Sequence, residues 1–100
     1  MSIVLIGGHD RMGRQYKEMG KEKGHQIKVY TQMPARFAKS IGNPDAILFF
    51  TNTVSHKMIR VATTEAKKLK IPVFKSHSSS ADSLQKAIKN LEDSLEGKKI

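Results

Sequence analysis

The chain has 100 residues, of which 38% are hydrophobic and 27% are charged, and it contains no cysteine. This length suits one small hydrophobic core and excludes two, and the lack of cysteine excludes a disulfide framework, a thiolate nucleophile and a zinc finger. Eighteen Lys and Arg residues against nine Asp and Glu residues give a net charge of +9, which favours anionic partners.

Targeting and membrane signals are missing from the sequence. No apolar run approaches the roughly 20 residues that a membrane-spanning helix needs, and Met1 leads directly into a strand-like segment without the charged stretch of a signal peptide. We therefore expect a cytoplasmic protein that does not bind a membrane. We expect one α/β domain over residues 1–96 and a frayed tail over residues 97–100.

The first half of the chain predicts two strands and two helices. Ser2–Ile6 is a continuous apolar run, typical of a strand covered on both faces. A helical pattern follows, for which Asp10 is the predicted N-cap and Gly24 the predicted end. Gln26–Tyr30 alternates between polar and apolar residues, as edge strands do. Pro34 then opens a short predicted helix.

The second half repeats this pattern. In Asp45–Phe50 a second continuous apolar run follows the aspartate, and the segment predicts a second central strand. An amphipathic helix follows, with an apolar stripe that ends at Leu69. Ile71–Phe74 is short and carries a proline near its start, which is typical of an edge strand. Ser79 and Asp82 form a capping pattern that introduces the last helix.

This order of elements predicts the topology. Right-handed crossovers, with the two buried strands at the centre, give a three-layer, Rossmann/flavodoxin-like α/β domain whose four-stranded parallel sheet has the order 2-1-3-4. The chain changes direction between the first and third strands, which places a crevice at the C-terminal edge of the sheet. Open α/β folds bind their ligands in this position.

Polar loops follow three of the predicted strands and meet at this edge. Gly7 and Gly8 follow the first strand, where the backbone either turns tightly or approaches a ligand, and both roles remain open. Arg11 lies at the start of a helix, where the helix dipole mildly disfavours a cation, and this indicates an anionic partner. Serine-rich helix starts offer amides and hydroxyls to an oxyanion or cap the helices. The candidate ligand-binding residues are Gly7, Gly8, His9, Arg11, Thr53, Ser55, His56, His77 and Ser78.

From these residues we expect a small-ligand-binding or sensor domain. It would hold an anionic compound, phosphate-bearing or nucleotide-like, at the C-terminal edge of the sheet. No motif identifies the compound or a cofactor. Positions 7, 9 and 12 are Gly, His and Met where a dinucleotide fingerprint needs three glycines, and the chain has no Gly-Lys-Ser/Thr phosphate loop.

Two alternatives stay open. The first is an enzyme at the same crevice, with His56 as general base or with His9, His56 and His77 as metal ligands. We favour it less because no ligand-spacing motif joins these histidines. The second is a nucleic-acid binder that uses the basic helices. We favour it less because basic residues are spread over every predicted helix, as on a solvated surface.

A homodimer is also expected. Four strands cover little core, and the apolar stripe of the last helix, from Leu84 to Leu95, is longer than so small a sheet is expected to cover. Self-association would cover the remainder.

The chain resembles the domain of unknown function 2325 family from about Ser2 to Leu91. The resemblance is carried by the opening Val-Leu-Ile-Gly-Gly run with an arginine a few residues on, by Tyr16, by Thr53-Val54-Ser55-His56, and by Ile71-Pro72-Val73 before a serine-rich helix start. It implies a small bacterial or phage protein with a Rossmann-like fold and no established activity. The chain departs from the family after the second strand, where Thr31-Gln32-Met33-Pro34 replaces a His-Asp/Glu-Gly-Gly-like stretch.

Overall fold

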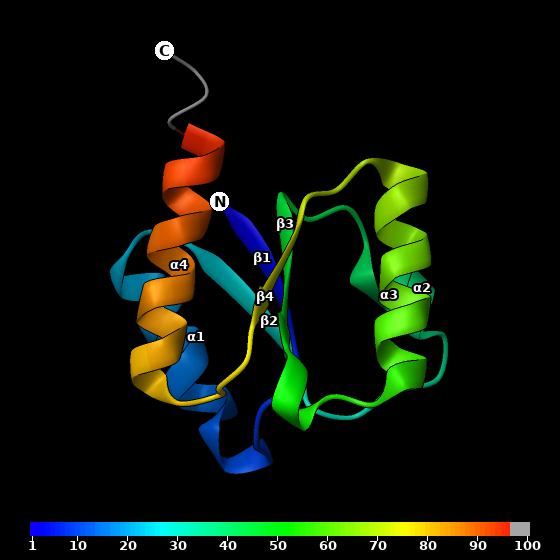
Figure 1. Cartoon of the computed structure of the whole chain (residues 1–100), viewed down its shortest axis with the longest axis horizontal. Coiled ribbons are helices and arrows are strands. Elements are labelled where there is room, and N and C mark those ends of the chain that lie inside the picture. The colour runs from blue at the N-terminus through cyan, green and yellow to red at the C-terminus, as the bar shows by residue number, and fades with distance from the viewer. Residues whose placement is uncertain (97–100) are drawn as a thin grey trace.

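The computed structural model describes residues 1–96, in which helices alternate with the strands of one parallel sheet (Figure 1). The strands are β1 (Ser2–Ile6), β2 (Gln26–Tyr30), β3 (Ala46–Phe50) and β4 (Val73–Ser76). The helices are η1 (Asp10–Met12), α1 (Gly13–Glu22), α2 (Phe37–Ile41), η2 (Thr51–Thr53), α3 (His56–Leu69) and α4 (Ala81–Glu96), where η marks a 3-10 helix. The sheet order β2-β1-β3-β4 confirms the predicted topology and Rossmann/flavodoxin-like class. The predicted tail over residues 97–100 lies outside the described residues.

The two apolar runs are the central strands. All five residues of β3 are buried, and so are four of the five in β1. Leu5 of β1 lies opposite Val29 of β2 on one side and Leu48 of β3 on the other. In the edge strand β2, exposed Gln26 and Lys28 flank a buried residue. Continuous apolar sequence therefore marks the strands that are covered on both faces.

Helices α1 and α4 cover one face of the sheet (Figure 1). Leu84, Ile88 and Leu91 of α4 are fully buried there, and Leu95 is partly buried against the same cluster. Each buried leucine contributes about 1.5–3 kcal/mol to stability. The stripe of α4 is thus covered within one chain, so it offers no free face for a second copy, and the homodimer remains a prediction without this support.

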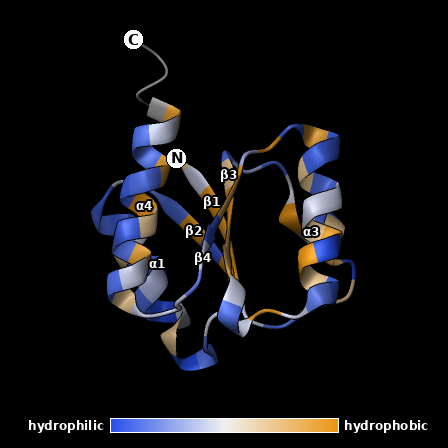
Figure 2. Ribbon diagram, viewed as in Figure 1, coloured by the Kyte–Doolittle hydropathy of each residue, from blue (hydrophilic) through white to orange (hydrophobic). Residues whose placement is uncertain are grey.

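Helices α2 and α3 cover the opposite face. Phe37 of α2 and Met58, Ala62 and Ala66 of α3 form a second buried cluster with the alternate side chains of β1 and β3. Figure 2 shows the apolar positions of the helices turned toward the sheet. Leu69, predicted to end this stripe, is instead 44% exposed. No helix within residues 1–96 has the length and apolar character needed to span a membrane.

Predicted boundaries were wrong by one to three residues in three elements. The short helix begins at Phe37 and not at Pro34, because Arg36 has a left-handed conformation with φ of 57°. β4 begins at Val73, because the amide of Ile71 still donates to the last turn of α3, at the carbonyl oxygen of Ala66. The third strand begins one residue after Asp45.

Candidate functional site

The loop after β1 is a glycine turn held by packing on its inner side. Gly7 and Gly8 have φ angles of 108° and 88°, which residues with a side chain rarely adopt. A Cβ atom on Gly8 would lie 2.8 Å from ring atom Cε2 of Tyr16, and one on Gly7 would lie 3.0 Å from the carbonyl oxygen of Phe50. The amide of Gly7 donates to the carbonyl oxygen of Tyr30 at 2.9 Å. Two roles were left open for these glycines, and the tight turn accounts for Gly7 and for Gly8.

Tyr16 of α1 is buried beneath this turn. Its ring centroid lies 5.4 Å from that of Phe50, and its hydroxyl donates to the carbonyl oxygen of Ser79 at 2.6 Å. Burial raises the pKa of Tyr16 above its ordinary value of 10.0, and hydrogen bonds with the backbone of His9 and with Ser79 act in the opposite direction. From the sequence, Tyr16 was named only among the residues that carry the family resemblance. Its hydroxyl was the feature that could have indicated a contact with another loop, since a buried tyrosine needs a polar partner.

Hydrogen bonds join the loops that follow β1, β3 and β4. The amide of Gly8 donates to the hydroxyl oxygen Oγ1 of Thr53 at 2.8 Å. The amide of Asn52 donates to the carbonyl oxygen of His77 at 3.2 Å. The Tyr16 hydroxyl adds a third connection, from α1 to the loop before α4. The three polar loops of the candidate site therefore form one continuous surface at the C-terminal edge of the sheet.

The sequence predicted that Asp10 caps the first helix, and this prediction was wrong. It lies in η1, and its carboxylate accepts hydrogen bonds from the hydroxyl of Thr31 and from Nε2 of Gln32. The N-cap of α1 is Met12, without a side-chain hydrogen bond. The turn of 3-10 helix separates Asp10 from the start of α1, so its carboxylate joins the loop after β1 to the loop after β2.

Serine hydroxyls cap the two long helices at this edge. Ser55 accepts from the amide of Met58, three residues into α3, at 3.2 Å. At α4 the predicted capping residue was wrong. Ser80 accepts from the amide of Ser83 at 3.1 Å, whereas Ser79 is buried with its carbonyl bound to the tyrosine hydroxyl. Helix capping is therefore the structural role of the Ser55 and Ser80 hydroxyls.

The candidate residues differ in exposure. Gly7 is buried, and Gly8, Thr53 and Ser78 are partly buried. The exposed candidates are His9, Arg11, Ser55, His56 and His77. Within the described part of the chain, the guanidinium of Arg11 makes no ion pair. The surface thus presents three imidazoles, one unpaired guanidinium and one hydroxyl.

The tri-histidine metal centre finds no support in this geometry. Among residues 1–96, no group of three or more His, Asp or Glu side chains is arranged to hold a metal ion. His9 and His77 lie in loops and His56 is the first residue of α3, and these segments are joined through backbone groups and a threonine hydroxyl, and not through the imidazoles.

The fourth histidine, His25, lies at the other edge of the sheet and was not a candidate. It is 6% exposed. Its Nδ1 lies 2.9 Å from the amino group of Met1, and its Nε2 lies 2.6 Å from Oε2 of Glu92. Since an ammonium group only donates, Nδ1 accepts and Nε2–H donates to the carboxylate. His25 therefore has the structural role of a buried, hydrogen-bonded histidine.

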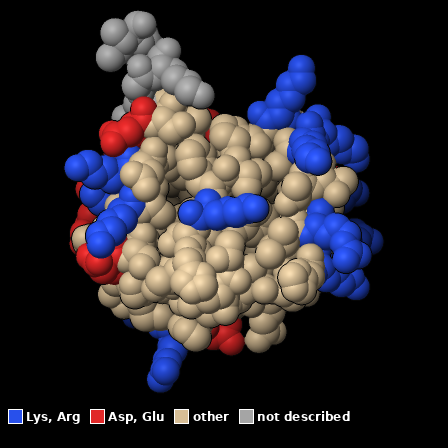
Figure 3. All heavy atoms as spheres, viewed as in Figure 1, with Lys and Arg blue, Asp and Glu red and all other residues tan. Residues whose placement is uncertain are grey.

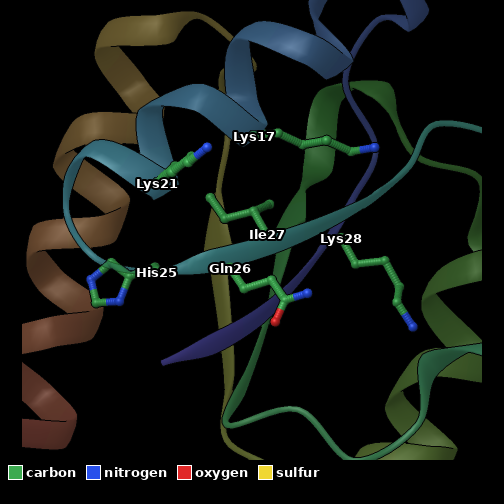
Figure 4. Close-up of a pocket in the computed structure, with 6 residues that line it drawn as sticks. All are labelled: Lys17, Lys21, His25, Gln26, Ile27 and Lys28. Atoms are coloured by element: carbon green, nitrogen blue, oxygen red, sulfur yellow. The ribbon is translucent and has the colours of Figure 1, made fainter.

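A cavity of about 500 Å³ lies away from the predicted edge, between α1 and β2 (Figure 4). Its lining residues are Lys17, Lys21, His25, Gln26, Ile27 and Lys28. Two further cavities are lined by residues near the starts of β1 and β2 and by residues between α3 and β4. None of these three cavities is lined by a candidate residue, so the joined loops form an open surface and not one of these pockets.

Comparison with known proteins is consistent with the fold. A family model described as "Uncharacterized protein conserved in bacteria (DUF2325)" matches residues 2–91. No curated protein and no solved structure matches the chain.

Proposed function

The chain belongs to the DUF2325 family, and for this member we propose a small-ligand-binding or sensor function at the C-terminal edge of the sheet. The ligand is an anionic compound, phosphate-bearing or nucleotide-like. The observation that carries the proposal is the set of hydrogen bonds from Gly8 to Thr53 and from Asn52 to His77. They hold three polar loops together at the position where open α/β sheets bind ligands.

Arg11 is the main anion-binding group in this proposal. It is exposed and makes no ion pair within residues 1–96, and a guanidinium binds phosphate or carboxylate through paired hydrogen bonds. The first-turn amides of α3, at His56 and Lys57, donate no hydrogen bond within the described residues. A helix N-terminus with unpaired amides favours an anion.

The remaining candidates divide into two groups in this proposal. Gly7, Gly8 and Thr53 shape the surface, because their backbone and hydroxyl groups already bond to neighbouring loops. The exposed imidazoles of His9, His56 and His77, with the hydroxyls of Ser55 and Ser78, set the outline of the site. Apart from Ser55, whose hydroxyl also caps α3, this division separates residues whose loss disturbs folding from residues whose loss removes binding.

Thermal denaturation with a panel of nucleotides and inorganic phosphate tests the proposal. A ligand at about 100 times its Kd stabilises the folded chain by about 2.7 kcal/mol, which raises Tm by about 11–22 °C in a domain of this size. Arg11→Ala should abolish the rise. Arg14→Ala is the matched control, because Arg14 is also exposed but lies on α1 in an ion pair with Glu18, and it should keep the rise.

Two results would contradict the proposal. One is the absence of a shift with every anion in the panel. The other is an equal loss of the shift in Arg11→Ala and Arg14→Ala, since this would show a response to net charge and not to a site.

A further inference from the structure

The positive charge of this protein is concentrated in one helical layer. Residues 36–41 and 56–70, which hold α2 and α3, contain seven Lys and Arg residues and one acidic residue, a net charge of +6. Residues 10–23 and 81–96, which hold η1, α1 and α4, contain seven basic and seven acidic residues, a net charge of zero. The sequence suggested an even spread because every helix has basic residues. The two layers have equal numbers of basic residues, so the difference in net charge comes from the acidic residues.

The cations of this layer point into solvent. They are exposed, and they are Arg36, Lys39, Lys57, Arg60, Lys67, Lys68 and Lys70. Within residues 1–96 the only ion pair among them joins Lys68 to Glu65 at 3.6 Å. Figure 3 shows cations without carboxylates on the visible side that carries α3, and a mixture of both signs on the side of α4. We name the cations of this layer the α3 face.

The helix dipole explains only part of the α3 face. Cations in the last turn of a helix are stabilised by the dipole, which accounts for Lys67 and Lys68. Lys57 lies in the first turn of α3, which has no acidic residue, and there the dipole disfavours a cation, whereas Arg60 lies beyond the turns on which the dipole acts. The dipole therefore accounts for Lys67 but not for Lys57 and Arg60, and Lys57 lies against the local electrostatics of the helix.

The chemistry of the face selects one kind of partner. We propose that the α3 face binds the phosphate backbone of a nucleic acid, without reading its sequence. Lys57 to Lys70 span about 20 Å of helix, long enough to lie beside several phosphates. Protein partners usually require an apolar centre, and membrane-surface helices require an apolar face. The only exposed large hydrophobic residue described on α3 is Leu69, because its apolar stripe is buried against the sheet.

A cavity continues the face toward the edge strand β4. It has a volume of about 420 Å³, and Lys67 and Lys70 of the α3 face line it together with Lys75 of β4. Ile71 and Val73 also line it. The cations thus follow a path from the start of α3 to β4, and nucleic-acid interfaces have this polar, positively charged character.

Fluorescence polarisation with labelled single-stranded DNA, duplex DNA and RNA of about 20 nucleotides tests this inference. We expect binding that weakens steeply between about 50 and 200 mM salt, because bound phosphates release counterions. The variant Lys57→Glu/Arg60→Glu/Lys67→Glu should weaken binding by more than about 30-fold. The three nucleic acids distinguish which backbone the face prefers.

The matched control is Lys17→Glu/Lys21→Glu/Lys89→Glu, in exposed residues of the opposite layer. It changes the net charge by the same amount and should weaken binding by less than about threefold. Circular dichroism checks that both variants fold. Equal losses in the two variants, no binding to any of the three at about 50 mM salt, or binding to anionic vesicles in place of nucleic acid would overturn the inference. Arg11→Ala should leave nucleic-acid binding nearly unchanged, so the two proposals fail separately.

Discussion

Both edges of the sheet carry histidine, but the histidines differ in burial and in hydrogen bonding. At the N-terminal edge, His25 is buried and bonds to Glu92 and to the amino group of Met1. At the C-terminal edge, His56 and His77 are exposed. A buried polar group requires partners to be tolerated, whereas an exposed one is free to meet a ligand. The residue type alone therefore does not identify a site, and the partners of each imidazole do.

The C-terminal edge also has an inner layer that resembles the N-terminal edge. Gly8, Tyr16 and Ser79 form a packed and hydrogen-bonded base, and the exposed candidates lie above it. Changes in this base should affect folding, and changes above it should affect binding. Three substitutions test this division.

Gly8→Ala should have the largest effect on stability. We expect the free energy of unfolding to fall by about 3 kcal/mol, because the φ of 88° is strained for alanine and the new Cβ would lie 2.8 Å from the Tyr16 ring. Gly24→Ala is the control at the N-terminal edge, since its φ is 80° but nothing lies within 4 Å of the new Cβ. It should cost about 1 kcal/mol. Urea denaturation measures both, and equal losses would show that packing does not hold the Gly8 turn.

His25→Ala and His56→Ala compare the two kinds of histidine directly. His25→Ala should lower the free energy of unfolding by about 2 kcal/mol, since it removes a buried hydrogen bond to Glu92 and leaves a cavity. His56→Ala should change it by less than about 0.5 kcal/mol, as exposed substitutions do. A large loss in His56→Ala would assign this residue to the fold, against its place in the proposed site.

Within the packed base, Tyr16→Phe should have a smaller effect than Gly8→Ala at neutral pH, about 1 kcal/mol, from the lost hydrogen bond to Ser79. Its signature lies at high pH. Burial raises the pKa of Tyr16 in the folded chain above 10.0, so the stability that the neutral phenol contributes is complete below that pH and is lost as the pH rises through the folded pKa. Wild-type stability should therefore fall more steeply above pH 10 than that of Tyr16→Phe. Parallel profiles in urea denaturation would place the hydroxyl in water.

The candidate site was predicted in outline and not in its bonds. Strand ends in a parallel sheet share one edge, so the meeting of the loops at Gly8, Thr53 and His77 followed from topology. Asp10 and Ser79 were predicted as helix caps from their neighbours in sequence. Asp10 instead bonds Thr31, which is 21 residues away, and Ser79 bonds Tyr16, which is 63 residues away. A local sequence pattern contains no information about partners that are distant in the chain.

The sequence by itself determined the elements of this protein and their order in the sheet. Runs such as Ile3–Ile6 are apolar at every position only where both faces are covered, and crossover handedness leaves one order for two central and two edge strands. The tertiary structure alone decided which polar groups are satisfied and where the charge lies. A hydrogen bond between distant residues, or a net charge of +6 on one layer, depends on which face each helix covers, and this sums contributions from segments that are separate in the chain.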